Sequence, residues 1–123
     1  MIGTMRIAMV LSALALAGAA RAGGDAVRGE ARFQDCAACH RLDGTNNVGP
    51  SLHGIFSRKA AGIADFRYSP AMKRSGIVWT PETLEKFIGD PQAMVPGNRM
   101  PYAGMTNAND RADLIAYLSK ASQ

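Results

Sequence analysis

Two cysteines and a histidine stand together in the pentapeptide Cys36-Ala37-Ala38-Cys39-His40, and this motif constrains the chain more than any other feature. The spacing Cys-x-x-Cys-His is typical of covalent attachment of a c-type haem. The two thiols add to the two vinyl groups of the porphyrin, and the histidine gives a nitrogen to the iron. The sequence therefore predicts a fold built around one haem c, bound through Cys36 and Cys39.

Two other interpretations of the motif are weaker. A redox dithiol would use the two cysteines but has no need of the histidine that follows them. A zinc site could combine Cys36, Cys39, His40 and His53, the only cysteines and histidines of the chain. Zinc prefers four tetrahedral ligands, and the adjacent residues Cys39 and His40 would be hard to aim at one ion. The haem interpretation is therefore preferred.

The first 22 residues have the features of a secretory signal peptide. Arg6 supplies a positive charge, residues 7–20 form an apolar run, and residues 20–22 have the small-x-small form of a cleavage site. The apolar run is shorter than the ~20 residues that span a bilayer. We expect a mature domain at 23–123 that is exported to the periplasm, with an uncleaved N-terminal anchor as the alternative.

Half of the formal net charge of the chain belongs to this leader. The formal net charge is +4, and without Arg6 and Arg21 the remainder holds 12 basic and 10 acidic side chains. Two haem propionates would cancel most of that difference. The sequence has no basic run, glycine-rich phosphate loop or repeat, so we do not expect nucleic-acid binding.

Patterns typical of helices occur both before and after the motif, and no convincing pair of strands is found. Residues 41–68 are broken by glycine and proline and are expected to form a loop, as are residues 91–101. Caps and apolar spacing predict the helices, with Asp110 as a reciprocal cap of the last one. These helices are expected at 26–35, 69–76, 80–89 and from 107 onward. The predicted fold class is all-α, with four to five short helices wrapped around one covalently attached haem.

The residue on the second side of the iron decides the function. The candidates are His53, Met72, Met94, Met100 and Met105. Methionine usually fills core space, but Met100 lies in an irregular loop that prolines stiffen on both sides, so it is favoured. A protein ligand leaves electron transfer as the function, whereas an open site would permit oxygen or peroxide chemistry.

At this point the chain resembles the class I cytochromes c, and in particular small soluble bacterial members similar to mitochondrial cytochrome c. The resemblance covers residues 24–121. It depends on five segments, which together are highly specific for this family. The segments that carry it are 36–40, Gly49-Pro50-Ser51-Leu52-His53-Gly54, Gly76-Ile77-Val78-Trp79, Pro96-Gly97-Asn98-Arg99-Met100 and Arg111-Ala112-Asp113-Leu114-Ile115-Ala116-Tyr117-Leu118. The resemblance implies the cytochrome c fold and iron held by His40 and Met100.

The resemblance also implies roles for four further residues. The carbonyl of Pro50 is expected to accept a hydrogen bond from the second ring nitrogen of His40. Tyr68 and Trp79 stand where the family bonds a haem propionate, and Arg58 stands where an arginine approaches the same group. A contact between the first and last helices, through Gly29, Phe33 and Tyr117, is implied as well.

Two positions depart from the family pattern. Phe87 stands where a tyrosine hydroxyl usually lies near the methionine sulfur, and Met72 stands where an asparagine often holds an internal water. Both changes remove polar atoms from the Met100 side of the haem. We expect a drier pocket whose potential depends less on hydrogen bonds.

The function implied is that of a periplasmic electron carrier and not of an enzyme, so no catalytic residue is expected. It would shuttle electrons in transient contacts with membrane or periplasmic redox proteins, such as a cytochrome complex, an oxidase or a dehydrogenase. We expect a monomer without a membrane span after signal removal. Only four lysines follow the leader, at 59, 73, 86 and 120, so docking should depend weakly on charge. The alternatives are a haem enzyme or gas-binding protein with an open sixth site, and a dedicated subunit of one dehydrogenase or oxidase.

Overall fold

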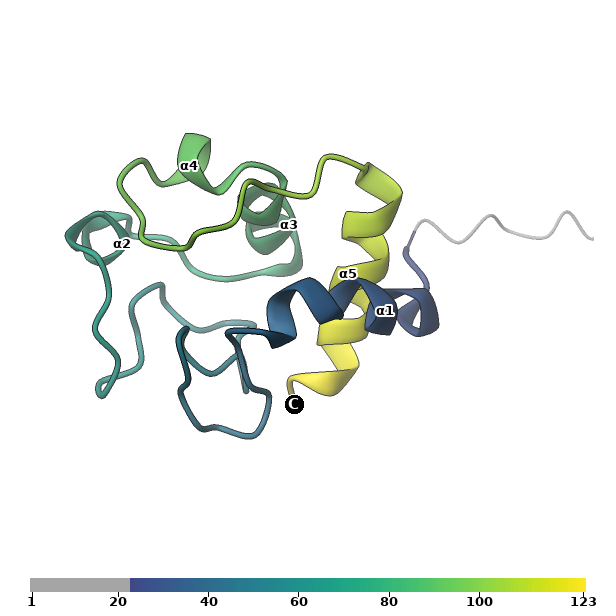
Figure 1. Ribbon diagram of the computed structural model, residues 1–123, viewed down its shortest axis with the longest axis horizontal. Coiled ribbons are helices and arrows are strands. Elements are labelled where there is room, and N and C mark those ends of the chain that lie inside the picture. Colours follow the sequence, from purple (N-terminus) through teal and green to yellow (C-terminus); the bar gives the residue numbers. More distant parts are fainter. Residues whose placement is uncertain (1–22) are drawn as a thin grey trace, which may run out of the picture.

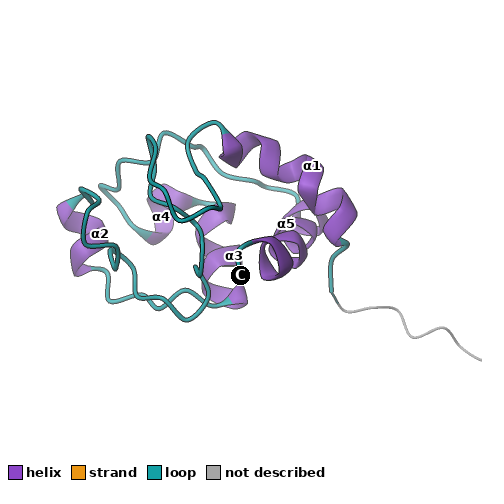
Figure 2. Ribbon diagram, turned by 90° about the horizontal axis from the view of Figure 1, so that it is seen from below, coloured by secondary structure: helices purple, strands orange, loops and turns teal. Residues whose placement is uncertain are grey.

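The computed structural model describes residues 23–123, which contain helices and loops but no strand (Figure 1). The predicted signal segment 1–22 lies outside the described residues. The helices are α1 (Ala26–Ala37), α2 (Pro70–Arg74), α3 (Pro81–Gly89), α4 (Pro91–Met94) and α5 (Ala108–Ala121). Long loops join them and make up one side of the molecule (Figure 2). The expected all-α class with four to five short helices is confirmed.

The helices begin where side-chain caps and prolines place them. Thr80 and Thr83 form a capping box at the start of α3, each side chain accepting from the other's backbone N–H. α2, α3 and α4 each have a proline in the first turn, where the missing N–H costs nothing.

Two expectations about the helices were wrong. Residues 91–101 are not wholly irregular, because α4 occupies their first turn. The Asp90 carboxylate accepts from the backbone N–H of Ala93 at 3.1 Å and caps that turn. At the start of α5, the Asn107 side chain accepts from the N–H of Asp110 at 3.0 Å, but the reverse bond is not present. The Asp110 carboxylate instead pairs with Arg32 of α1 at 3.3 Å.

The first and last described helices cross in close contact, on the right in Figure 1. A Cβ added at Gly29 of α1 would lie 1.9 Å from the carbonyl oxygen of Asp113 in α5. Only glycine allows this approach. The rings of Phe33 and Tyr117 pack with their centroids 5.4 Å apart. The predicted contact between these helices is confirmed.

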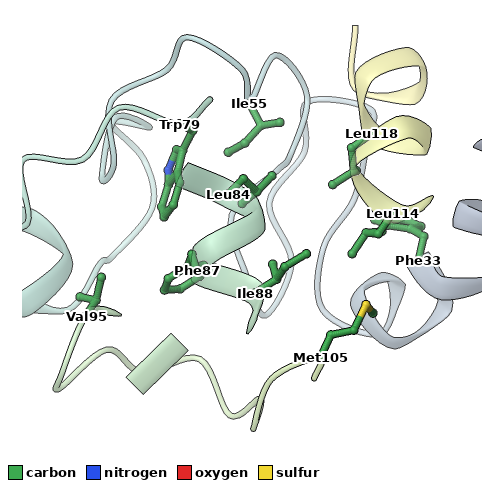
Figure 3. Close-up of a cluster of buried hydrophobic side chains, with 10 residues drawn as sticks. All are labelled: Phe33, Ile55, Trp79, Leu84, Phe87, Ile88, Val95, Met105, Leu114 and Leu118. Atoms are coloured by element: carbon green, nitrogen blue, oxygen red, sulfur yellow. The ribbon is translucent and has the colours of Figure 1, made fainter. Parts of the chain in front are cut away.

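The hydrophobic core joins this helix pair to α3 (Figure 3). Its buried side chains are Phe33, Ile55, Trp79, Leu84, Phe87, Ile88, Val95, Met105, Leu114 and Leu118. The rings of Trp79 and Phe87 pack at 5.1 Å. Leu42, Leu52, Met72, Met94, Met100 and Tyr102 are among the partly buried residues around this core.

Candidate cofactor site

The cysteine motif occupies the C-terminal end of α1, which runs two residues beyond its expected end and includes Cys36. The backbone N–H groups of Cys39 and His40 donate to the carbonyl of Cys36 at 3.1 and 2.9 Å. The helix therefore continues into a turn that fixes the relative positions of the two cysteines. Both are partly buried and neither forms a disulfide.

The surroundings of Cys36 do not favour the two weaker interpretations of the motif. Burial, with smaller effects from Asp35 and Cys39, raises the pKa of the Cys36 thiol to about 11. A redox dithiol needs a lowered thiol pKa to act as a nucleophile. Within residues 23–123, no three cysteine, histidine or acidic side chains are grouped so that they could hold a metal ion.

The ring of His40 is held by the loop that follows the motif. Its Nδ1 lies 2.7 Å from the carbonyl oxygen of Pro50, so Nδ1 carries the proton and donates it. This tautomer leaves Nε2 with a lone pair for a metal. Gly49 lets the loop approach, since a Cβ there would lie 2.4 Å from the ring carbon Cε1.

The electrostatics of His40 also suit a ligand. Burial lowers its pKa, and the charge of Arg58 lowers it further against the opposing effect of the Pro50 bond. The neutral imidazole is therefore the favoured form, and this is the form that binds metals.

Arg58 is a half-buried cation without an acidic partner among the described residues. Its two terminal nitrogens donate to the carbonyls of His53 at 3.0 Å and Ser51 at 2.9 Å. Burial lowers the pKa of this guanidinium. A cation removed from water without a counter-charge is unfavourable, so this position fits an anionic group such as a haem propionate.

Tyr68 and Trp79 offer further donors near the same segment. The Tyr68 hydroxyl oxygen accepts from the backbone N–H of Ile63 at 3.2 Å, which leaves its own proton to donate. The hydrogen bonds among residues 23–123 do not use the indole N–H of the buried Trp79. The backbone of Trp79 pairs with that of Arg58 through an N–H···O bond of 2.9 Å, so these two residues are held together.

The five candidates for the second ligand lie in different surroundings. Met105 is buried in the core beside α3 and α5 (Figure 3), and His53 is exposed. Met72, Met94 and Met100 are partly buried against the core. Met100 is restrained at both backbone groups: its N–H donates to the Asn98 side chain at 2.9 Å, and its carbonyl accepts from Tyr102 at 2.8 Å. The backbone of Met72 is also bonded at both groups, but by Ser69 and Ser75 at the ends of the short helix α2.

Two polar residues that hold this loop were not singled out from the sequence. Asn98 is buried beneath it, and Arg111 of α5 holds its end. Arg111 donates to the carbonyls of Met105 at 2.8 Å and Thr106 at 2.9 Å, and it also pairs with Glu85 of α3. A local signal existed only for Asn98, because asparagine in a proline-rich loop commonly bonds nearby backbone groups.

Comparison with known proteins agrees with this arrangement. The family model described as cytochrome c matches residues 26–122. The chain is 43% identical over 117 residues to cytochrome c2 of Rhodomicrobium vannielii, covering 94% of each chain. It is 45% identical over 100 residues to cytochrome c2 of Agrobacterium tumefaciens, covering 77% of this chain and 90% of that one.

A solved structure shows the same fold. Cytochrome cH from Methylobacterium extorquens superposes with a TM-score of 0.74 at 39% identity, covering 78% of this chain and 98% of that one. The chain belongs to the cytochrome c family, whose members carry electrons on a haem. Haem c is bound covalently through Cys36 and Cys39. The neutral His40 ring and the unpaired Arg58 both fit that group.

Proposed function

We propose that this protein is a periplasmic electron carrier whose haem iron is held by His40 and Met100. The observation that carries the proposal is the contact of His40 with Pro50, which fixes the ring and leaves Nε2 for the iron. The restrained backbone of Met100 supports its assignment as the second ligand. A thioether is a weak ligand and needs such pre-positioning.

The chemistry of the haem is the one-electron exchange between ferric and ferrous iron. The chain's own residues keep the surroundings of the iron nearly constant, so that little rearrangement accompanies each transfer. The Pro50 carbonyl restrains the His40 ring, while Asn98 and Tyr102 restrain Met100. None of these residues acts on a substrate, so we assign no catalytic residue.

Arg58, Tyr68 and Trp79 are proposed to hold a haem propionate. The guanidinium of Arg58 supplies the counter-charge, while Tyr68 and Trp79 each have one N–H or O–H not donated to another described residue. Charge-assisted hydrogen bonds of this kind are roughly twice as strong as neutral ones. They would compensate for taking a carboxylate out of water.

We also propose that residues 1–22 are a signal peptide that is removed and that residues 23–123 form the mature, monomeric domain. Among residues 23–123, no helix has the length and hydrophobicity needed to cross a membrane. The partners we propose are membrane or periplasmic redox proteins of a respiratory chain or of a dehydrogenase, met in transient contacts. No nucleic acid is involved.

Optical spectroscopy tests the ligand assignment. The ferric protein should show the weak red band of sulfur-to-iron charge transfer, and Met100→Ala should abolish it. Met94→Ala, which also removes a partly buried methionine, should keep the band. Rapid binding of carbon monoxide to the reduced wild type would contradict the proposal and favour a haem enzyme or gas-binding protein with an open sixth site.

The salt dependence of electron transfer tests the docking mode. With few lysines and an uncharged segment at 101–107, long-range attraction should contribute little. Rates with a redox partner should therefore change by less than about threefold between low and physiological ionic strength. A steep fall with salt would show that charge governs docking.

A further inference from the structure

Asn98 is a buried polar side chain whose hydrogen-bonding groups are all used within residues 91–100, which comprise α4 and the loop after it. Only 7% of its surface is exposed. Its amide nitrogen Nδ2 donates to the carbonyls of Pro91 at 3.0 Å and Val95 at 2.9 Å. Its oxygen Oδ1 accepts from the backbone N–H of Met100 at 2.9 Å. The orientation of the amide is determined, because two carbonyls require the NH₂ group and the N–H requires the oxygen.

These bonds connect Met100 to the part of the loop that is anchored in the protein. Pro91 begins α4 and is fully buried, and Val95 follows α4 with 3% of its surface exposed. The carbonyl of Val95 also accepts from the backbone N–H of Asn98 at 3.1 Å. Movement of Met100 away from this position would therefore leave buried polar groups unpaired, which is unfavourable.

A second amide side chain supports the same turn from outside. Gln92 donates from Nε2 to the carbonyl of Asn98 at 3.1 Å, and its Oε1 accepts from the N–H of Gly97 at 3.3 Å. Gln92 is exposed and does not bond Met100. The two amides therefore brace one turn, but only Asn98 bonds the backbone of the proposed ligand.

We propose that Asn98 is a positioning residue for the sixth ligand: it holds the backbone of Met100 in place and limits how often the sulfur leaves the iron. This inference rests on the proposed function, in which Met100 is that ligand. The side chain of Asn98 does not touch the iron. Its effect passes through the Met100 N–H and through the anchorage at Pro91 and Val95.

The test compares the ferric holoprotein with Asn98→Leu, which removes all three bonds at similar volume, and Asn98→Asp, which keeps an acceptor for Met100 but loses both donors. The Asp variant serves if the Leu variant does not fold. Gln92→Ala is the matched control. Imidazole at saturating concentration is the probe, since its uptake is then limited by the departure of the methionine from the iron.

We expect both Asn98 variants to take up imidazole at least about tenfold faster than the wild type, because a tenfold change corresponds to the loss of about 1.4 kcal/mol, the size of one buried hydrogen bond. Gln92→Ala should change the rate by less than about threefold. Uptake at the wild-type rate in the Asn98 variants would overturn the proposal. Equal acceleration of imidazole uptake in all three variants would also overturn the proposal, because a general loosening of the turn would then explain the faster uptake.

Hydrogen exchange of single amides gives a readout that does not depend on the iron. In Asn98→Leu the Met100 amide should exchange faster, while the Met105 amide, which donates to Ile88 at 2.7 Å, should keep its protection. Parallel acceleration of both amides would indicate global destabilisation and contradict the positioning role. A wild type without the sulfur-to-iron band would instead refute the ligand assignment, even with the Met100 amide result intact.

Discussion

The α1–α5 pair and the loops around the cofactor site are held together in different ways. The helix pair depends on close packing, with Gly29 against the backbone of Asp113 and Phe33 against Tyr117. The loops depend on side chains that bond backbone groups, as Asn98 and Arg58 do. The stability of the fold and the positions of the residues proposed to contact the haem therefore depend on separate parts of the molecule and should respond to different substitutions.

Gly29→Ala should have the largest effect on stability. The added methyl group would lie 1.9 Å from the carbonyl oxygen of Asp113, so the helices must separate. We expect a loss of about 2 kcal/mol or more in the free energy of unfolding, despite the better helix propensity of alanine. Denaturant titration measures this loss. Gly23→Ala is the control, because a Cβ there meets no atom within 4 Å.

Equal stability of Gly29→Ala and Gly23→Ala would remove close packing as the distinguishing feature of the helix pair. The same denaturant titration can be monitored by the sulfur-to-iron band, which compares unfolding of the Met100 loop with loss of helicity. That band should disappear together with helicity in Gly29→Ala, since this substitution does not touch the loop of Met100.

Phe87→Tyr should have the next largest effect and should act on the cofactor side. Phe87 is buried and packs on Trp79, so the added hydroxyl enters an apolar region. Without a hydrogen-bond partner, this hydroxyl should lower the free energy of unfolding by about 1–2 kcal/mol. Because it is a polar group on the proposed methionine side of the haem, it should also shift the midpoint potential of the haem. Phe56→Tyr, at a partly buried position, is the control. An unchanged potential and an unchanged Fe–S bond strength in Phe87→Tyr would argue against a dry pocket.

The sequence predicted the two parts of the molecule unequally. Capping residues and apolar spacing placed α3 and α5 to within a few residues, because these signals act locally. The loop contacts follow no repeating pattern, although they join residues only five to seven positions apart. Arg58 bonds carbonyls of its own loop, and Arg111 of α5 bonds carbonyls at the end of the loop that precedes that helix. Resemblance to a family singled out Arg58, but for a haem propionate and not for these carbonyls, and nothing in the sequence singled out the contacts of Arg111.

The ion pair of the helix contact should make part of the stability depend on pH. Hydrogen bonds from the Arg28 guanidinium and from the backbone N–H of Asp25 hold the pKa of the Asp113 carboxyl below its usual value, and Arg32 acts in the same direction. A carboxyl with a lowered folded pKa stabilises the fold above its ordinary pKa of about 3.9. That contribution is lost as the pH falls through the lower folded value.

We therefore expect the wild type to lose stability below a pH of about 4 and Asp113→Asn to lose less over the same range. Thermal melts at a series of pH values measure both. Asp43→Asn is the control: Arg41 and Thr45 hold the pKa of Asp43 below its usual value too, but this exposed residue lies in a loop. If the stability of Asp113→Asn and of the wild type changes with pH in the same way, the helix ion pair is not the source of the pH dependence.

The smallest effect concerns backbone geometry in the loop that carries Arg58. Ala61 has a φ of 60°, in the left-handed region that favours glycine. Ala61→Gly should therefore raise the free energy of unfolding, but by less than about 1 kcal/mol, because glycine also gains freedom in the unfolded chain. Gly44→Ala makes the opposite change at a φ of 87° in open space and should lower stability by a similar amount. If Ala61→Gly raises stability while the potential stays constant, side-chain bonds and not backbone strain hold Arg58 at the proposed propionate site. A shifted potential would mean that the strained backbone itself contributes to the position of Arg58, and the loops would then share the dependence on rigid geometry that marks the helix pair.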